Sequence, residues 1–150
     1  MSTPTAVASV EVPCDPDTAF AVFTADIGTW WKRGTWYWND PERGQQLRFE
    51  PHVGGRLIEV YDTAAGTGFE IGRVLAWEPG KRLVFTWRQG NWGPDESTEV
   101  EVRFEPAAGG TRVTVEHRGW DRAPSAEPGT AEGYGQGWGE LLGFFAESAG

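Results

Sequence analysis

Apolar and polar residues alternate along most of this chain, with the two-residue period of β-strands. The first such segment is 6–12, which has alanine or valine at every even position. Further segments of this kind cover residues 46–50, 56–61, 68–77, 82–88, 97–105 and 111–118. Between two of them, Glu78-Pro79-Gly80-Lys81 has proline and glycine where a type II turn needs them. Six consecutive strands joined by short turns predict an antiparallel meander.

Other parts of the chain show the period of a helix. Asp15 and Pro16 are an N-cap residue and a proline at the first helical position, and apolar side chains follow at helical spacing. We therefore expect a short helix over residues 16–25. A second short helix or turn is expected over 27–31, and a loop over 34–45.

The end of the chain is predicted to form a longer helix with one apolar face. That face carries Tyr134, Trp138, Leu141, Leu142 and Phe145. Glycines at 133, 135, 137, 139 and 143 oppose the helix at ~1 kcal/mol each relative to alanine. Burial of the aromatic face must therefore compensate. The glycines also let the helix lie close to the sheet or to a ligand.

The length and composition fit one globular domain over residues 1–150. No segment approaches the ~20 apolar residues of a membrane helix, and the N-terminus lacks a basic stretch followed by an apolar one. One cysteine, Cys14, allows no intrachain disulfide. We expect a cytoplasmic protein that does not enter a membrane.

Charge and aromatic content narrow the expected partners. Acidic residues outnumber basic ones by 22 to 13, so the formal net charge is −9. Such a chain repels phosphate backbones, and no basic stripe overrides the repulsion, so nucleic acid is not an expected partner. The chain also has nine tryptophans, more than a core of this size needs. They predict a broad aromatic wall that is either packed solid or partly hollow.

The order of strand, helices, six strands and long helix resembles the START-like (SRPBCC) superfamily. Within it the chain resembles the branch of the C-terminal domain of the activator of the heat-shock chaperone ATPase. The segments that carry the resemblance are VEVPCDPDTAFAVFT, IGTWW, PHVGGRLIEV, GRVLAWEPGKRLVFTWR, STEVEVRFEP, GGTRVTVEHRGW and GWGELLGFF. The resemblance implies an α+β helix-grip fold, in which a curved antiparallel sheet of about seven strands wraps around a long C-terminal helix. It also implies short helices after the first strand and a cavity between sheet and helix.

The predicted strand and helix faces indicate which side chains would line this cavity. From the sheet we expect Leu83, Phe85, Trp87, Val100, Val102, Phe104, Val113, Val115 and His117, and from the helix Tyr134, Trp138, Leu141 and Phe145. Trp30 and Trp31 would close one end. Glu59, Tyr61, Glu70 and Arg73 lie on strands whose inward parity the pattern leaves open. We include Tyr61 among the lining residues.

Two departures from the family limit what the resemblance implies. The eukaryotic activator has a separate N-terminal domain without a counterpart in these residues, so a chaperone partner is not assumed. Relatives often have a histidine three residues before the final Gly-Trp pair, and here that position is Tyr134. A role that needs an imidazole at this position is therefore not expected.

His117 is the most notable titratable residue, because it ends an apolar strand face. In a pocket it could act as a general acid or base, with a carboxylate or Tyr61 as its partner. The alternative, which we favour, is an imidazole hydrogen-bonded for packing and orientation. The pattern therefore favours a protein that is not an enzyme.

The remaining candidates have weaker support. Trp30, Trp31 and residues 36–38 surround two cations and could form the cavity mouth, a structural aromatic cluster or a stacking surface. Cys14 has no nearby histidine in sequence, and His52 is expected to be solvated. One cysteine and two histidines offer little for a metal, and the common dinucleotide, phosphate-loop and hydrolase motifs are missing, so no cofactor is expected.

Together these observations predict a protein that binds a small hydrophobic or aromatic molecule in the cavity. One alternative is a cyclase- or hydrolase-type enzyme that uses His117. Another is a chaperone-interacting module with an exposed apolar patch at 36–38, Trp92 and Trp120. A homodimer is also kept open.

Overall fold

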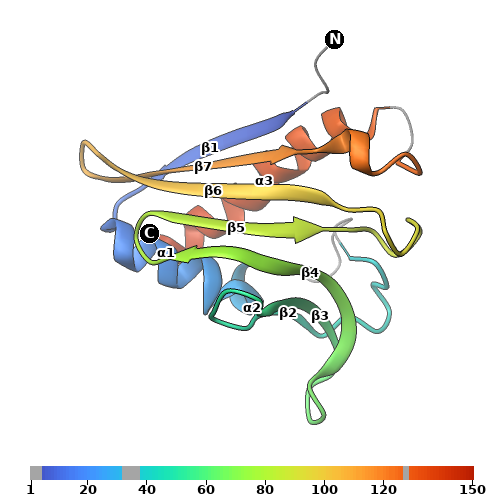
Figure 1. Cartoon of the computed structure of the whole chain (residues 1–150). Coiled ribbons are helices and arrows are strands. Elements are labelled where there is room, and N and C mark those ends of the chain that lie inside the picture. Colours follow the sequence, from blue (N-terminus) through green and yellow to red (C-terminus); the bar gives the residue numbers. More distant parts are fainter. Residues whose placement is uncertain (1–4, 32–37, 127–128) are drawn as a thin grey trace.

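The strands form one curved antiparallel sheet. The computed structural model describes residues 5–31, 38–126 and 129–150. Its strands are β1 (Ala6–Val12), β2 (Gln46–Phe49), β3 (Arg56–Asp62), β4 (Thr67–Glu78), β5 (Arg82–Trp87), β6 (Thr98–Ala107) and β7 (Gly110–Arg118). They make a seven-stranded sheet in the order β1-β7-β6-β5-β4-β3-β2 (Figure 1). The predicted meander is confirmed, and β1 pairs with β7 at its end.

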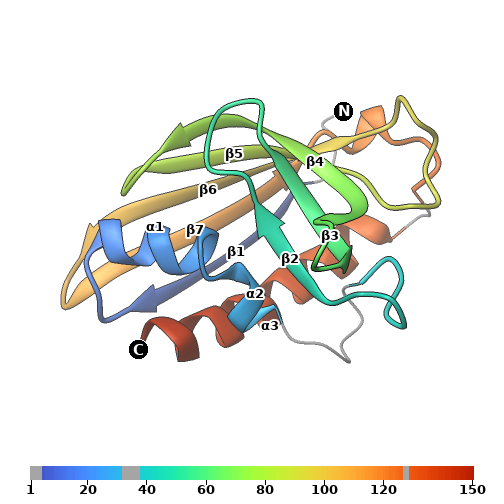
Figure 2. The ribbon, with the colours of Figure 1, turned by 90° about the horizontal axis from the view of Figure 1, so that it is seen from below.

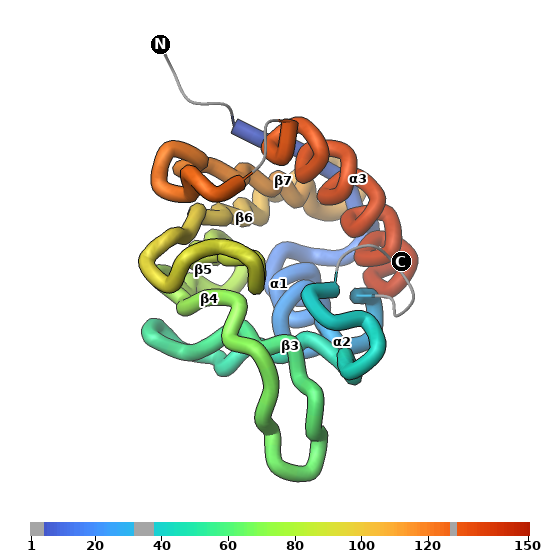
Figure 3. Tube along the Cα trace, turned by 90° about the vertical axis from the view of Figure 1, so that its right-hand side faces the viewer, coloured from blue at the N-terminus to red at the C-terminus, as the bar shows by residue number. Residues whose placement is uncertain are grey.

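The helices lie on the concave side of this sheet (Figure 2). They are α1 (Pro16–Thr24), α2 (Ile27–Trp30) and α3 (Thr130–Ala149), and a 3-10 turn, η1 (Trp120–Arg122), precedes α3. The α3 helix lies along β1, and α2 lies against β2 (Figure 3). Helices therefore cover the sheet from both of its edges. Among the described helices, none is both long and apolar enough to cross a membrane.

Local residues define the starts and turns of these elements. The Asp15 carboxylate accepts a hydrogen bond from the Thr18 N–H at 2.7 Å and so caps α1, as predicted. Gly80 adopts a φ of +74°, and the Lys81 N–H donates to the Glu78 carbonyl at 2.9 Å, as the predicted turn requires. The α3 helix starts earlier than its apolar face, directly after Gly129, whose φ is +87°.

Alternation along the strands separates an apolar inner face from a charged outer face. The inner side chains with at most 1% exposure are Leu83, Phe85, Val100, Val102, Val113 and Val115. On the outer face, the Arg118 guanidinium contacts Glu99 at 2.6 Å and Glu101 at 2.7 Å. The β6 and β7 strands therefore follow the two-residue period that the sequence predicts.

Aromatic side chains fill one end of the concave side. Phe23 of α1 lies 5.1 Å from Trp30 and 5.5 Å from Phe145, measured between ring centroids. Phe20 lies 5.2 Å from Phe104 in the same way. These rings connect both short helices to α3 and β6. This end of the space between sheet and helices is therefore filled with packed side chains.

The β3 strand breaks the alternation. Its pairing with β4 shifts register between Leu57 and Ile58 and again between Val60 and Asp62. Four successive side chains are buried as a result: Leu57, Ile58, Glu59 and Val60. The β3–β4 hairpin extends away from the helices (Figure 3). Because of the bulge, parity along β3 does not determine which side chains face inward.

Candidate functional site

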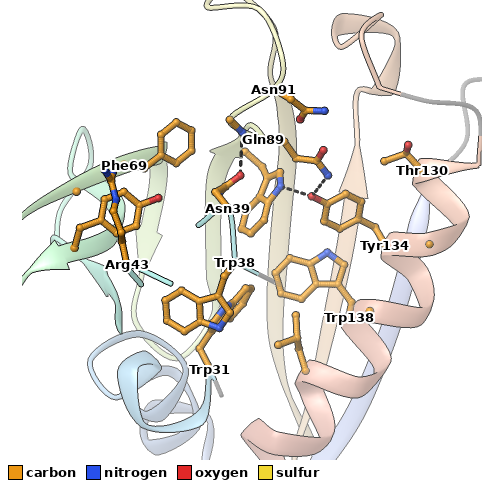
Figure 4. Close-up of a pocket in the computed structure, with 17 residues that line it drawn as sticks. Trp31, Trp38, Asn39, Arg43, Phe69, Gln89, Asn91, Thr130, Tyr134 and Trp138 are labelled. Carbon is orange, nitrogen blue, oxygen red and sulfur yellow. Dashed lines mark hydrogen bonds between the residues drawn. The ribbon is translucent and has the colours of Figure 1, made fainter. Parts of the chain in front are cut away.

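A cavity of about 910 Å³ lies at the other end of the concave side. Its walls come from the end of β3, the start of β4, the end of β5, the segments 38–43 and 89–91, and the first half of α3 (Figure 4). The described lining residues are Trp31, Trp38, Asn39, Arg43, Tyr61, Gly68, Phe69, Trp87, Gln89, Gly90, Asn91, Thr130, Gly133, Tyr134, Gly137, Trp138 and Leu141. This volume is in the usual range for small-molecule sites.

The structure divides the predicted lining residues into two groups. Those at the cavity are Trp31, Tyr61, Trp87, Tyr134, Trp138 and Leu141. Those that do not line the cavity are Trp30, Phe85, Val102, Phe104, Val115, His117 and Phe145, all buried in the core. The α1 and α2 helices cover part of this group, because Phe23 packs on Phe104 and Trp30 on Phe145. His117 is covered instead by Trp120, Tyr134 and Trp138. Leu83, Val100 and Val113, also predicted as lining, are equally buried.

Several lining residues were not predicted because they lie in segments without a regular period. Asn39, Arg43 and Gln89 belong to irregular connections, and Thr130 to the first turn of α3. The sequence did indicate Gly133 and Gly137, because each directly precedes an aromatic residue that was predicted to line the cavity. A Cβ at Gly133 would meet nothing within 4 Å, so this part of the helix presents bare backbone to the cavity.

Glu59 attaches the wall segment 38–43 to the sheet. Its side chain is fully buried and accepts hydrogen bonds from the backbone N–H of Asn39 at 2.8 Å and of Asp40 at 2.9 Å. The Tyr61 hydroxyl donates to the same carboxylate at 2.7 Å. A buried carboxylate is stable only when hydrogen bonds compensate its lost hydration. Here the compensating donors come from the cavity wall, which is fixed in place as a result.

Asn39 extends this contact across the cavity mouth. Its amide oxygen accepts a hydrogen bond from the Gly90 N–H at 2.9 Å, and its amide nitrogen donates to Glu59 at 3.3 Å. Nearby, the Arg43 guanidinium lies 4.3 Å from the centre of the Tyr61 ring and pairs with Asp40 at 3.1 Å. Burial raises the pKa of Tyr61, and the Glu59 carboxylate raises it further. Tyr61 is therefore a neutral hydrogen-bond donor in this wall.

The other mid-sheet candidates do not face the cavity. Glu70 and Arg73 are exposed and form an ion pair at 2.8 Å. The pair lies on a sheet surface where such contacts contribute little to stability.

His117 is fully buried and hydrogen-bonded through both ring nitrogens. Its Nε2 lies 2.6 Å from the Thr98 hydroxyl oxygen, and the Trp138 indole N–H donates to Nδ1 at 3.1 Å. Burial lowers the pKa of His117 from 6.5 to about 3. An acid or base in catalysis must reach the reacting atoms. His117 has neither contact with the cavity nor a nitrogen left for a substrate, which matches the structural role favoured above.

Tyr134 stands where relatives often have histidine, and its hydroxyl faces the cavity (Figure 4). The hydroxyl oxygen accepts hydrogen bonds from the Trp87 indole N–H at 2.9 Å and from the Gln89 amide at 2.6 Å. Burial raises the pKa of Tyr134, although these two bonds oppose the shift. The hydroxyl therefore stays neutral and keeps its proton.

The cavity differs in charge from the rest of the chain. Its described lining contains Arg43 and no aspartate or glutamate, although acidic residues outnumber basic ones by 22 to 13 in the whole chain. Because Asp40, just outside the lining, neutralises Arg43 at 3.1 Å, the cavity accommodates neutral molecules better than ions of either sign.

Other sequence candidates lie elsewhere. Cys14 is half-buried, and burial raises the pKa of its thiol, whereas a reactive cysteine needs a lowered one. His52 is exposed. Of the predicted apolar patch, Trp38, Trp92 and Trp120 are buried, and residues 36 and 37 lie outside the described ranges, as do the cations at 32 and 33. Within the described ranges, no three histidine, cysteine or acidic side chains gather as a metal site would require.

Comparison with known proteins gives a family and a fold. The model of the family described as "Activator of Hsp90 ATPase homolog 1-like protein" matches residues 13–149. The solution structure of the Aha1 dimer from Colwellia psychrerythraea is 18% identical with a TM-score of 0.67, over 98% of this chain and 96% of that one. Protein MLL2253 from Mesorhizobium loti is 20% identical with a TM-score of 0.65, over 95% and 94%. Protein CV1439 from Chromobacterium violaceum is 18% identical with a TM-score of 0.65, over 97% and 96%. No match was found among the curated proteins.

Proposed function

This chain belongs to the activator of Hsp90 ATPase homolog 1-like family, and from the geometry of its cavity we propose that it binds a small hydrophobic or aromatic molecule there. The observation that carries the proposal is the hollow of about 910 Å³ walled by the indoles of Trp31, Trp38, Trp87 and Trp138. Burial of apolar surface against such walls contributes about 25 cal/mol per Å² before the costs of association. The role is binding, transport or sequestration, without a covalent step.

The arrangement around the cavity supports a site that exists before the ligand arrives. Glu59 holds the wall segment 38–43, and Asn39 bonds across the mouth to Gly90. A wall fixed by hydrogen bonds loses little conformational entropy when a ligand binds, which increases affinity. The hydrophobic walls and few polar groups are typical of small-molecule sites.

Tryptophan fluorescence and thermal melting test the proposal directly. A panel of fatty acids, flat aromatic compounds and sterols is titrated into the protein, with the emission of the cavity indoles as the signal. A bound compound should change the emission and raise Tm in proportion to its concentration above Kd. If no compound of the panel changed the emission or raised Tm, the proposal would be contradicted.

A cavity-filling variant links any binding to this site. Gly133→Leu places a side chain in the hollow, where a Cβ at this position meets no atom within 4 Å. Gly139→Leu is the matched control, because Gly139 is exposed on the same helix and also has open space around its Cβ. Both changes improve helix propensity by roughly the same amount. We expect Gly133→Leu to weaken binding at least tenfold and Gly139→Leu to leave it unchanged.

Self-association and a chaperone partner are two alternatives that the sequence leaves open. The solved relative from Colwellia psychrerythraea is described as a dimer, and sedimentation of this chain across concentrations tests whether it forms one. Among the described residues, the exposed large apolar side chains are Val7, Val53 and Leu75. Val7 lies on β1, whereas Val53 and Leu75 are next to Gly54 and Val74, which are hydrogen-bonded to each other at 2.8 Å.

A further inference from the structure

Trp87, Gln89 and Tyr134 form a polar corner in an otherwise aromatic cavity. We name these residues the donor corner. The Trp87 indole N–H and the Gln89 amide converge on the Tyr134 hydroxyl, and all three side chains line the cavity (Figure 4). Tyr134 comes from α3, and the other two come from the end of β5 and the segment after it. The corner therefore joins the sheet side of the cavity to the helix side.

The hydrogen-bond count at this corner leaves a donor for the cavity. A tyrosine hydroxyl has one proton and two acceptor lone pairs. Both lone pairs of Tyr134 are used, by Trp87 at 2.9 Å and by Gln89 at 2.6 Å. Its proton has no acceptor among the described residues. If the Gln89 amide is turned over, its oxygen accepts that proton and its N–H groups face the cavity instead. In either orientation the corner presents a donor.

The charge of the lining selects among ligands that could use this donor. Aromatic walls can also attract cations through their ring faces. A charged molecule in this cavity would lose hydration without gaining an ion-pair partner, because Arg43 is already paired with Asp40 at 3.1 Å and the other described lining residues are uncharged. A neutral molecule avoids this cost. The walls, the donor and the charge thus favour the same class of compound.

We propose that the ligand is a flat, neutral aromatic molecule whose hydrogen-bond acceptor, such as a carbonyl oxygen, is bound by the donor corner. This inference rests on the proposed binding function and specifies its ligand class. A site that hydrogen-bonds one group of a ligand rejects analogues without that group, because its own polar atoms then stay unpaired. Tyr134 and Gln89 are the residues that determine this specificity.

Matched probes test the assignment. 2-Acetylnaphthalene has a carbonyl acceptor, 2-ethylnaphthalene has the same ring and a similar shape without it, and 1-(2-naphthyl)ethylamine is a cation at neutral pH. Kd is measured for each by tryptophan fluorescence and calorimetry. The decisive quantity is the ratio of the acetyl affinity to the ethyl affinity, because each compound's own transfer free energy from water cancels when protein variants are compared.

The triple variant Trp87→Phe, Gln89→Leu and Tyr134→Phe removes every donor of the corner. Trp87 is included because its indole N–H would lose its acceptor with the Tyr134 hydroxyl and would donate to the ligand instead. We expect the acetyl-to-ethyl ratio to fall at least fivefold. Gln136→Leu is the control, since Gln136 is exposed on α3 outside the cavity, and it should keep the wild-type ratio. If the triple variant does not fold, the carbonyl stretch of 2-acetylnaphthalene bound to the wild-type protein is measured instead, and it should lie below its value in an alkane because a hydrogen bond lowers it.

The outcomes separate this inference from the proposed function. An unchanged ratio in the triple variant, or an alkane-like carbonyl stretch of the bound acetyl probe, would overturn the donor corner while ethyl binding still supports the cavity. Tighter binding of the amine than of the ethyl compound would overturn the charge selection. Failure of both the acetyl and the ethyl probe to bind the wild-type protein would contradict cavity binding of such aromatics, and this inference with it.

Discussion

The indole N–H of Trp138 donates to Nδ1 of His117 at 3.1 Å and thereby fixes the tautomer of the imidazole. An indole nitrogen is only a donor, so Nδ1 must be unprotonated and Nε2 carries the ring proton. Nε2 then donates to the Thr98 hydroxyl at 2.6 Å, which donates to the Trp87 carbonyl at 3.3 Å. The chain of bonds joins α3 to β7, β6 and β5. Its function is to hold the helix in register on the sheet.

Protonation of His117 would break this chain, so stability should depend on pH. The pKa of His117 is about 3 in the folded protein and 6.5 in the unfolded chain. The unfolded state therefore binds the additional proton between these values. The stabilising effect is complete above pH 6.5 and is lost as pH falls toward 3. We expect a loss of about 2 kcal/mol between pH 7.5 and pH 5 in urea unfolding.

The variant His117→Gln should lack this part of the pH dependence, although it is less stable at pH 7.5. The matched control is His52→Gln, because His52 is exposed and its change should keep the wild-type slope. Equal slopes for His117→Gln and wild type would show that His117 is not the group responsible.

Trp138→Phe should destabilise the protein through the same bond. The change leaves Nδ1 of a fully buried histidine without a donor. We expect a loss of about 1–3 kcal/mol for the unpaired acceptor, in addition to the smaller ring. Urea unfolding measures the loss. A cost no larger than that of Trp92→Phe, a buried tryptophan without this bond to His117, would count against the role given to the hydrogen bond.

Glu59→Gln should loosen the cavity wall. The amide replaces one carboxylate oxygen by a donor, which then faces the N–H of Asn39 or Asp40. We expect a stability loss of about 1–3 kcal/mol and weaker binding of 2-acetylnaphthalene. Tyr61→Phe removes one donor and leaves both backbone bonds, so it should cost about 1 kcal/mol or less. Equal effects of the two changes on stability would contradict the special role of the carboxylate.

Phe145→Ala should be the most costly truncation on α3. Phe145 is fully buried against Phe23 and Trp30, and its removal leaves a hole in solid core. We expect a loss of about 3–5 kcal/mol in the free energy of unfolding. Leu141→Ala, at a residue that borders the existing hollow, should cost less because fewer packing contacts are lost. The reverse order in chemical denaturation would show that the solid and hollow ends are assigned wrongly.

The fold followed from the sequence because β6 and β7 obey a strict two-residue period and the other strands approximate it. Val100, Val102 and Phe104 alternate with charged residues, and all three are buried. Glu59 could not be oriented because the β3 bulge buries consecutive side chains, a feature without a periodic signal. The strand and helix faces are therefore predictable, whereas a register shift is not.

The cavity was predictable only in part, for two physical reasons. Its aromatic walls at Trp87, Tyr134 and Trp138 lie on regular faces and were found. Asn39 and Gln89 lie on irregular segments that are positioned by long-range hydrogen bonds, which one sequence does not reveal. The prediction that Phe145 and Trp30 line the cavity is wrong, because the sequence pattern does not show how far α1 and α2 extend into the space between the sheet and α3.

The glycines of α3 have a further consequence for how occupancy can be observed. A helix with Gly133, Gly135, Gly137 and Gly139 in its first half has weak intrinsic propensity. Its backbone should open locally more often than the strands beneath it, so its amide protons should exchange with solvent sooner. A molecule seated against this bare backbone would slow that exchange. Deuterium uptake over residues 130–142 would then report a filled cavity even for compounds without any optical signal.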